Sequence, residues 1–135
     1  LLLDRVYGIL DKRVRNKQIT FLGVTLKANT DDMRDSSSLT MIPALIKKGA
    51  KIKYFDRTGY KKEFSKFKNV HYSSTIKESI IGSDLVIIHT EWNDFKSINF
   101  KNLIRGKKFI IFDMRNIYSA KKIRNQGFKY YSIGR

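Results

Sequence analysis

Short apolar segments alternate with helix-patterned segments along nearly the whole chain, and this alternation constrains the fold more than any other feature. Helices are expected at residues 39–48, 75–81, 100–105 and 120–126. Because strands that are apolar on both faces are typical of parallel sheets covered by helices, the pattern predicts a doubly wound, Rossmann-like α/β domain. The expected strands are rich in β-branched and aromatic residues and lie at residues 19–26, 51–55, 70–72, 84–90, 108–114 and 128–133.

A further helix is expected at the start of the chain, over residues 1–14. Its apolar stripe requires a partner that buries it. The partner lies in this domain, in a domain outside the sequence or in a second subunit, and the pattern alone leaves all three open. The stripe consists of apolar residues at helical spacing: Leu3, Val6, Tyr7, Leu10 and Val14.

Basic side chains are expected at one edge of the predicted sheet. Lys27, Arg57 and Arg115 each follow an expected strand. The carboxyl ends of parallel strands line the crevice in which such sheets bind their ligands. Arginine can hold phosphate through two parallel hydrogen bonds, and lysine acts as a point charge. This edge is therefore suited to a phosphate-bearing ligand.

The glycine fingerprint of a dinucleotide-binding domain is missing. The turn after the first expected strand reads GVTLKA over residues 23–28, with Gly23 as its one glycine, whereas a dinucleotide cradle requires G-x-G-x-x-G. Asp56 stands where a ribose-binding acid would stand, but without that fingerprint it is interpreted as a turn residue. The sequence therefore indicates a degenerate or second Rossmann unit within a larger enzyme.

Composition excludes several kinds of site. The 135 residues contain no cysteine, which excludes disulfides, thiolate zinc sites and a cysteine nucleophile within this chain. Two histidines are too few for a convincing metal site. No apolar run approaches the ~20 residues that span a bilayer, and no signal peptide is visible. A cytoplasmic location away from the membrane is expected.

The formal net charge of +16 admits two interpretations. One is a basic module that binds a polyanion such as nucleic acid. The other is a solvated, lysine-rich surface, which is favoured because the basic residues are scattered along the chain rather than gathered in one block. Nucleic acid is therefore an unlikely partner, although a polyanion-binding module stays open as an alternative.

Four segments resemble a known family. They are residues 22–37 (LGVTLKANTDDMRDSS), 50–56, 84–92 and 112–116. In order and spacing they resemble the C-terminal domain of the nucleotide-sugar dehydrogenases, over essentially residues 1–135. The NTDDMR and TEW motifs are most similar to the UDP-glucose 6-dehydrogenase branch. The GDP-mannose and UDP-N-acetylmannosamine branches are the alternatives.

The resemblance implies a cofactor, partners and a division into domains. In this family an N-terminal domain binds NAD and carries the catalytic cysteine, and a long central helix builds a homodimer. The C-terminal domain binds the UDP half of the substrate, whose sugar C6 alcohol is oxidised to a carboxylate in two NAD-dependent steps. Residues 1–16 are accordingly expected to end the central helix, and residues 17–135 to form the UDP-sugar-binding domain.

The same resemblance implies substrate-binding residues and no catalytic residue within this chain. Leu26 and Lys27 match the family's substrate-contact pair, although Leu26 stands where the family usually has Phe. Arg115 matches its substrate arginine, and Arg57 replaces the usual Pro after Asp56. Alone, the chain is expected to be inactive, either as one domain of a complete UDP-glucose dehydrogenase or as a truncated relic.

Four other residues receive an interpretation. Arg34 matches an arginine that reaches NAD across the interdomain cleft, and pairing with a neighbouring aspartate is the alternative. His89 is expected to be packed or hydrogen-bonded in the core. Glu91 and Trp92 are expected to be interdomain or cleft-wall residues, without a chemical role.

Overall fold

A computed structural model describes residues 1–134, so Arg135, the last residue of the expected domain, lies outside the described residues. Six strands form one sheet in the order β3-β2-β1-β4-β5-β6, and all neighbouring pairs are parallel. This confirms the predicted Rossmann-like fold, with its topological switch point between β1 and β4. The strands are β1 (Gln18–Leu22), β2 (Lys51–Phe55), β3 (Val70–Tyr72), β4 (Leu85–Ile88), β5 (Ile110–Asp113) and β6 (Tyr130–Ser132).

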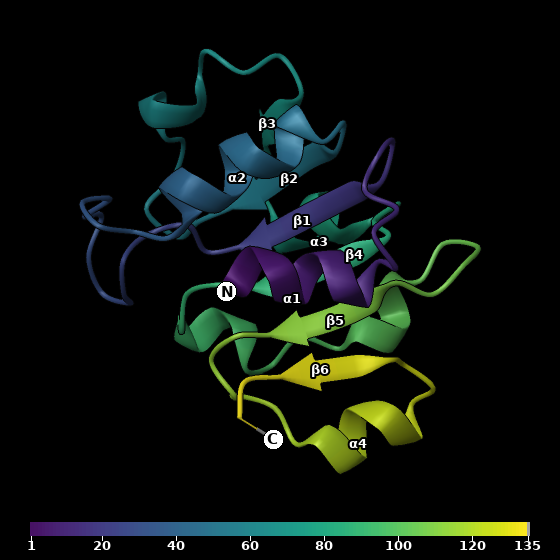
Figure 1. Cartoon of the computed structure of the whole chain (residues 1–135). Helices are drawn as coiled ribbons and strands as arrows, with labels where there is room; N and C mark the ends of the chain where they lie inside the picture. Colours follow the sequence, from purple (N-terminus) through teal and green to yellow (C-terminus); the bar gives the residue numbers. More distant parts are fainter. Residues whose placement is uncertain (135) are drawn as a thin grey trace.

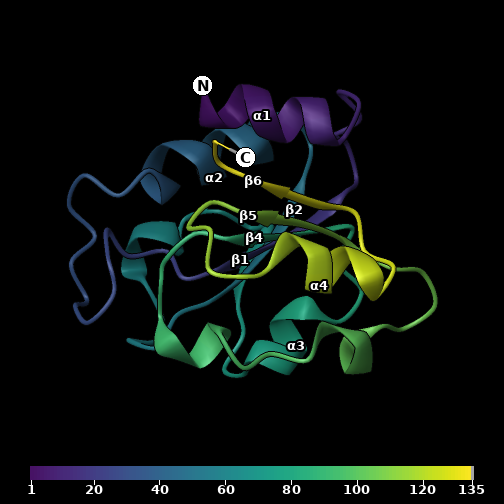
Figure 2. The ribbon, with the colours of Figure 1, turned by 90° about the horizontal axis from the view of Figure 1, so that it is seen from below.

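Helices cover both faces of the sheet and give the fold three layers (Figure 1 and Figure 2). Within residues 1–134, none of the helices combines the length and the apolar content that crossing a membrane requires. On one face lie α1 (Leu2–Ile9) and α2 (Ser38–Lys47), and on the other lie α3 (Ile76–Ile80) and α4 (Ala120–Asn125). The connections include three 3-10 helices, η1 (Lys62–Phe64), η2 (Asn93–Phe95) and η3 (Phe100–Leu103).

The central strands contribute to two separate cores, because successive side chains point to opposite faces of a sheet. In β4, Leu85 and Ile87 join the core beneath α1 and α2. Val86 and Ile88 join the second core, beneath α3 and α4. All four side chains are fully buried, and burying each is worth about 1.5–3 kcal/mol. The uninterrupted apolar run of this strand thus follows from its position at the centre of a sheet covered on both faces.

The apolar stripe of the first helix packs against this domain itself. Val6 is fully buried and Val14 is 4% exposed, and both belong to the core beneath α2. Arg5 donates a hydrogen bond of 3.0 Å to the carbonyl oxygen of Ser132, and its guanidinium carbon lies 5.4 Å from the centre of the Phe112 ring. Of the three possible partners, the sheet of the same chain is therefore the one that buries these residues.

The first helix is shorter than the prediction of residues 1–14. It ends at Ile9, and the backbone φ angles of Asp11 and Lys12 are 53° and 63°. Left-handed residues interrupt a right-handed helix. Leu10 and Val14 consequently reach the core from a loop rather than from the helix.

The first strand also ends earlier than predicted. The chain leaves the sheet after Leu22 and turns at Gly23, whose φ is 81°. A Cβ atom built on Gly23 would lie 2.3 Å from the Cβ of Thr90, so only glycine fits between the ends of β1 and β4. The turn directs the following residues, including Lys27, into a loop. The last three strands likewise extend one or two residues less at each end than predicted.

Replacing Gly23 by alanine is expected to destabilise the fold, because it adds both an unfavourable φ and a steric overlap with Thr90. The expected loss is about 3 kcal/mol, measured by urea unfolding. Gly59→Ala is the matched control, since Gly59 has a φ of 92° but open space around its Cβ position. It should cost only about 1 kcal/mol. Equal losses in the two variants would contradict the close approach of β1 and β4.

Candidate functional site

A depression of about 320 Å³ lies at the carboxyl ends of β1, β4 and β5. We call it the strand-end crevice. It brings together Lys27 and Arg115, as the sequence predicts for residues at this edge. Their role as ligand contacts stays a prediction. The other residues that line the crevice are Ala28, Asn29, Glu91, Asn93 and Lys96.

The loop that carries Lys27 follows β1 and is anchored to the ends of the two strands that flank β1, which are β2 and β4. Asp56, directly after β2, accepts hydrogen bonds from the backbone N–H groups of Val24 at 2.8 Å and Thr25 at 3.3 Å. Thr90, beyond β4, donates its hydroxyl to the carbonyl oxygen of Thr25 at 3.0 Å. Because both anchors lie immediately before Leu26, the base of the loop is fixed while its exposed side chains face solvent.

Asp56 is a turn residue, as predicted. Besides the two loop N–H groups it accepts hydrogen bonds from the backbone N–H of Thr58 at 2.9 Å and from the Thr58 hydroxyl at 2.6 Å. It is 1% exposed. A carboxylate committed in this way cannot hold a ribose, and the turn at Gly23 lacks the further glycines of a pyrophosphate cradle. The crevice of this domain therefore does not fit NAD.

Arg115 is held by its own backbone and by one side-chain contact. The carboxylate of Asp113, the last residue of β5, accepts the backbone N–H of Arg115 at 3.0 Å. The Arg115 Nε donates to the carbonyl oxygen of His89 at 2.7 Å. This contact uses only one of the five N–H donors of the guanidinium, so the side chain is oriented and keeps donors for a ligand.

His89 is a buried, hydrogen-bonded core residue, as predicted. Its Nε2 lies 2.8 Å from the Ser37 hydroxyl and its Nδ1 lies 3.2 Å from the Thr90 hydroxyl. Burial, together with the positive charge of Arg115, lowers the pKa of His89 to about 3. A neutral ring with its proton on Nδ1 satisfies both contacts, so His89 supports the crevice without carrying charge near pH 7.

Leu26 and Arg34 lie on the same loop as Lys27 but outside the crevice lining. Leu26 is 36% exposed. Arg34 donates from Nε and from one terminal nitrogen to the two carboxylate oxygens of Asp32, each at 3.1 Å. Hydrogen bonds from Arg34 hold the pKa of Asp32 below its usual value. The structure thus shows the predicted alternative for Arg34, pairing with an aspartate, while its contact with NAD stays a prediction.

Arg57 follows β2 at the same edge of the sheet, as predicted, but it is not among the residues that line the crevice. One of its terminal nitrogens donates to both carboxylate oxygens of Asp94, at 2.8 and 2.7 Å. The sequence showed Arg57 at a strand end but did not reveal that a carboxylate from another loop lies within reach.

The prediction for the segment after β4 is only partly confirmed. Glu91 lines the crevice. Trp92 is 4% exposed and packs in the core beneath α3 and α4, so it is not a cleft-wall residue. Its Nε1 is buried without a hydrogen-bond partner among residues 1–134. Sequence reasoning missed Lys96, which directly follows η2. It lies three residues after Asn93, a spacing that places both side chains on one side of a 3-10 turn.

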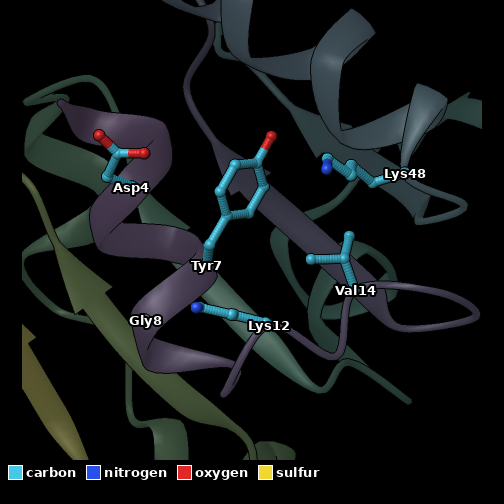
Figure 3. Close-up of a pocket in the computed structure, with 6 residues that line it drawn as sticks. All are labelled: Asp4, Tyr7, Gly8, Lys12, Val14 and Lys48. Carbon is cyan, nitrogen blue, oxygen red and sulfur yellow. The ribbon is translucent and has the colours of Figure 1, made fainter.

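A second hollow of about 330 Å³ lies between α1 and α2, near the amino ends of the strands (Figure 3). Tyr7 extends between the two helices, and the Nζ of Lys48 lies 5.5 Å from the centre of its ring. The lining includes Asp4 and Lys12 and is otherwise largely apolar. It contains none of the strand-end residues, so the crevice and not this hollow is the candidate site.

The chain thus forms a Rossmann-like domain. Its strand-end crevice offers cations but has no dinucleotide cradle, and it is suited to a phosphate-bearing ligand. Residues 20–120 match a family model described as the UDP-glucose/GDP-mannose dehydrogenase family, UDP binding domain. Because the match covers most of the chain, the chain belongs to this family. The resemblance seen in the sequence is confirmed.

Individual relatives support the same family assignment. The chain is 34% identical over 136 residues to the UDP-glucose 6-dehydrogenase of Rickettsia felis, covering 98% of this chain and 30% of the relative. A UDP-glucose dehydrogenase structure from Pyrobaculum islandicum matches with a TM-score of 0.74 and 23% identity, covering 96% of this chain and 28% of that one. A structure of UDP-D-ManNAc dehydrogenase from Pyrococcus horikoshii matches with a TM-score of 0.72 and 25% identity, covering 99% of this chain and 29% of that one. The chain thus spans about 30% of the length of the curated relative and corresponds to its C-terminal domain.

The buried His89 makes the stability of the fold depend on pH. Its folded pKa of about 3 lies below the ordinary value of 6.5, so the unfolded chain binds a proton that the folded chain does not. The contribution of His89 to stability is therefore fully present above pH 6.5 and is lost as the pH decreases from 6.5 toward about 3. Between pH 7 and pH 5 the expected loss is about 2 kcal/mol, measured by urea unfolding.

His89→Gln should remove this part of the pH dependence, although the variant is less stable at pH 7. His71→Gln, at an exposed position in β3, is the control and should keep it. If the wild-type chain and the His89→Gln variant lost the same stability between pH 7 and pH 5, burial of a neutral His89 would be contradicted.

Proposed function

We propose that this chain is the substrate-binding domain of an NAD-dependent UDP-glucose 6-dehydrogenase. Its strand-end crevice would bind the UDP half of the nucleotide sugar. The observation that carries the proposal is the convergence of Lys27, Lys96 and Arg115 from three loops on one depression. The family match and the Rickettsia relative support the choice of ligand.

The charge of the crevice suits a diphosphate. Its lining has three cations and one carboxylate, Glu91, which leaves a net charge of +2. None of the three cations forms an ion pair with a carboxylate among residues 1–134. The diphosphate of a nucleotide sugar carries two negative charges, and cations that are not already neutralised offer it the strongest attraction.

The residues of this domain would bind and orient the substrate. Lys27 supplies a point charge from the fixed base of its loop, and Arg115 supplies a planar donor group whose Nε is already held by His89. Leu26, with 36% of its surface exposed beside Lys27, offers an apolar contact to the nucleotide. A leucine has a smaller flat surface than the Phe usual at this position, so this contact is expected to be weaker.

NAD would be bound mainly by an N-terminal domain, because the crevice of this chain does not fit it. That domain would also supply the catalytic cysteine, and the present chain alone would be inactive. Arg34, whose side chain is 88% exposed, would reach the cofactor across the interdomain cleft. Residues 1–16 would end the central helix that joins the two domains and builds a homodimer, and the enzyme would be cytoplasmic.

Another nucleotide sugar is the second candidate substrate. The match to UDP-D-ManNAc dehydrogenase from Pyrococcus horikoshii favours it, because that protein shares the fold of this chain. Both candidates contain UDP, so the crevice would bind the same group in either case.

Lys27→Ala and Arg115→Ala are each expected to weaken UDP binding by about 10-fold or more. Each variant removes a charge-assisted hydrogen bond, worth about 1.5–3 kcal/mol. The measurement is calorimetric titration of the chain with UDP at low salt. Lys121→Ala, at an exposed position of α4 away from the crevice, is the control. Unchanged affinity in both crevice variants, or no UDP binding by the wild-type chain, would contradict the proposed function.

A further inference from the structure

The segment after β4 is built as a rigid wall of the crevice. Trp92 and Phe95 are 4% and 0% exposed and anchor it in the core beneath α3 and α4. Between and after these anchors, Asn93 and Lys96 line the crevice. The backbone N–H of Lys96 donates to the carbonyl oxygen of Asn93 at 3.0 Å, which closes the turn of η2. The buried rings thus fix where the base of the Lys96 side chain lies.

An ion pair also links this segment to the loop after β2. Arg57 in the loop after β2 contacts both carboxylate oxygens of Asp94, and Asp94 is the one residue between Asn93 and Phe95. β2 and β4 flank β1 in the sheet, so the pair links two loops across the carboxyl end of β1. The side chains of Arg57 and Asp94 are 59% and 30% exposed. At that exposure an ion pair adds little stability, but it ties η2 to the loop after β2.

We infer that Lys96 is a third cationic contact for the diphosphate and that the Arg57–Asp94 pair is a positioning device for it. This inference rests on the proposed function. A lysine side chain is long and loses considerable rotamer entropy when it is ordered. A wall fixed by two buried rings and one ion pair therefore holds the backbone of Lys96 at the crevice that Lys27 and Arg115 also line.

Because of the position of Asp94, the Arg57–Asp94 pair should affect the residues that line the crevice rather than the strands of the sheet. Asp94 lies within η2, directly beside Asn93 and two residues before Lys96. A movement of this short helix would displace both lining side chains together. The loop of Lys27 is anchored independently, through Asp56 and Thr90, so the ion pair should affect Lys96 without disturbing Lys27.

Lys96→Met tests the first part, because methionine keeps most of the side-chain length and removes the charge. UDP affinity is expected to fall about 10-fold in calorimetric titration, with no change in the midpoint of urea unfolding. Lys101→Met, at an exposed position of η3 outside the crevice, is the matched control and should bind UDP as the wild type does. Wild-type affinity in Lys96→Met would overturn the inference.

Arg57→Ala tests the positioning role. It is expected to weaken UDP binding about 3-fold in the wild-type background and to have no effect in the Lys96→Met background. A residue that acted only on overall stability would have the same effect in both backgrounds. Arg57→Lys should restore part of the affinity, since it keeps a charge near Asp94. An equal loss in both backgrounds would show that Arg57 does not act through Lys96.

The two proposals fail in different ways. If Lys27→Ala and Arg115→Ala weaken UDP binding while Lys96→Met does not, the proposed function stands and Lys96 is not a ligand contact. If the wild-type chain does not bind UDP, the proposed function and the assignment of Lys96 are both wrong.

Discussion

Two buried carboxylates at the ends of strands determine how the rest of the site is arranged. Asp56 follows β2 and Asp113 ends β5, and each is at most 1% exposed. Asp56 accepts backbone N–H groups of the loop before Lys27, and Asp113 accepts the backbone N–H groups of Arg115 and Tyr118. A buried carboxylate must be satisfied by hydrogen bonds, so the loops are held where these bonds can form. Lys27 and Arg115 thus extend from backbone that these two carboxylates hold in place.

The fold was predictable because it depends on patterns that are local in sequence. The apolar run from Leu85 to Ile88 indicated a strand buried on both faces, and the positions of Lys27 and Arg115 after strands indicated a shared edge. The ends of strands were less predictable. Gly23 ends β1 through its contact with Thr90, which lies far away in the sequence, and no local pattern records such a contact.

The same limit applies to the candidate site. The ion pair of Arg57 could not be predicted, because its carboxylate partner, Asp94, comes from a loop 37 residues later. Lys96 was missed because its place in the crevice lining depends on two buried rings, and Trp92 was itself misplaced in the cleft wall. Aromatic residues in a short polar segment were the available signal, since such residues usually anchor a loop in the core.

The sheet narrows toward both of its edges, where β3 and β6 contain only three residues each. An unpaired edge strand offers its backbone N–H and C=O groups to any other strand, and a long apolar edge promotes aggregation. Here the edge strands are short, and the apolar strands β1 and β4 lie at the centre of the sheet. The topology therefore keeps the most aggregation-prone segments of this chain away from other molecules as long as the domain stays folded.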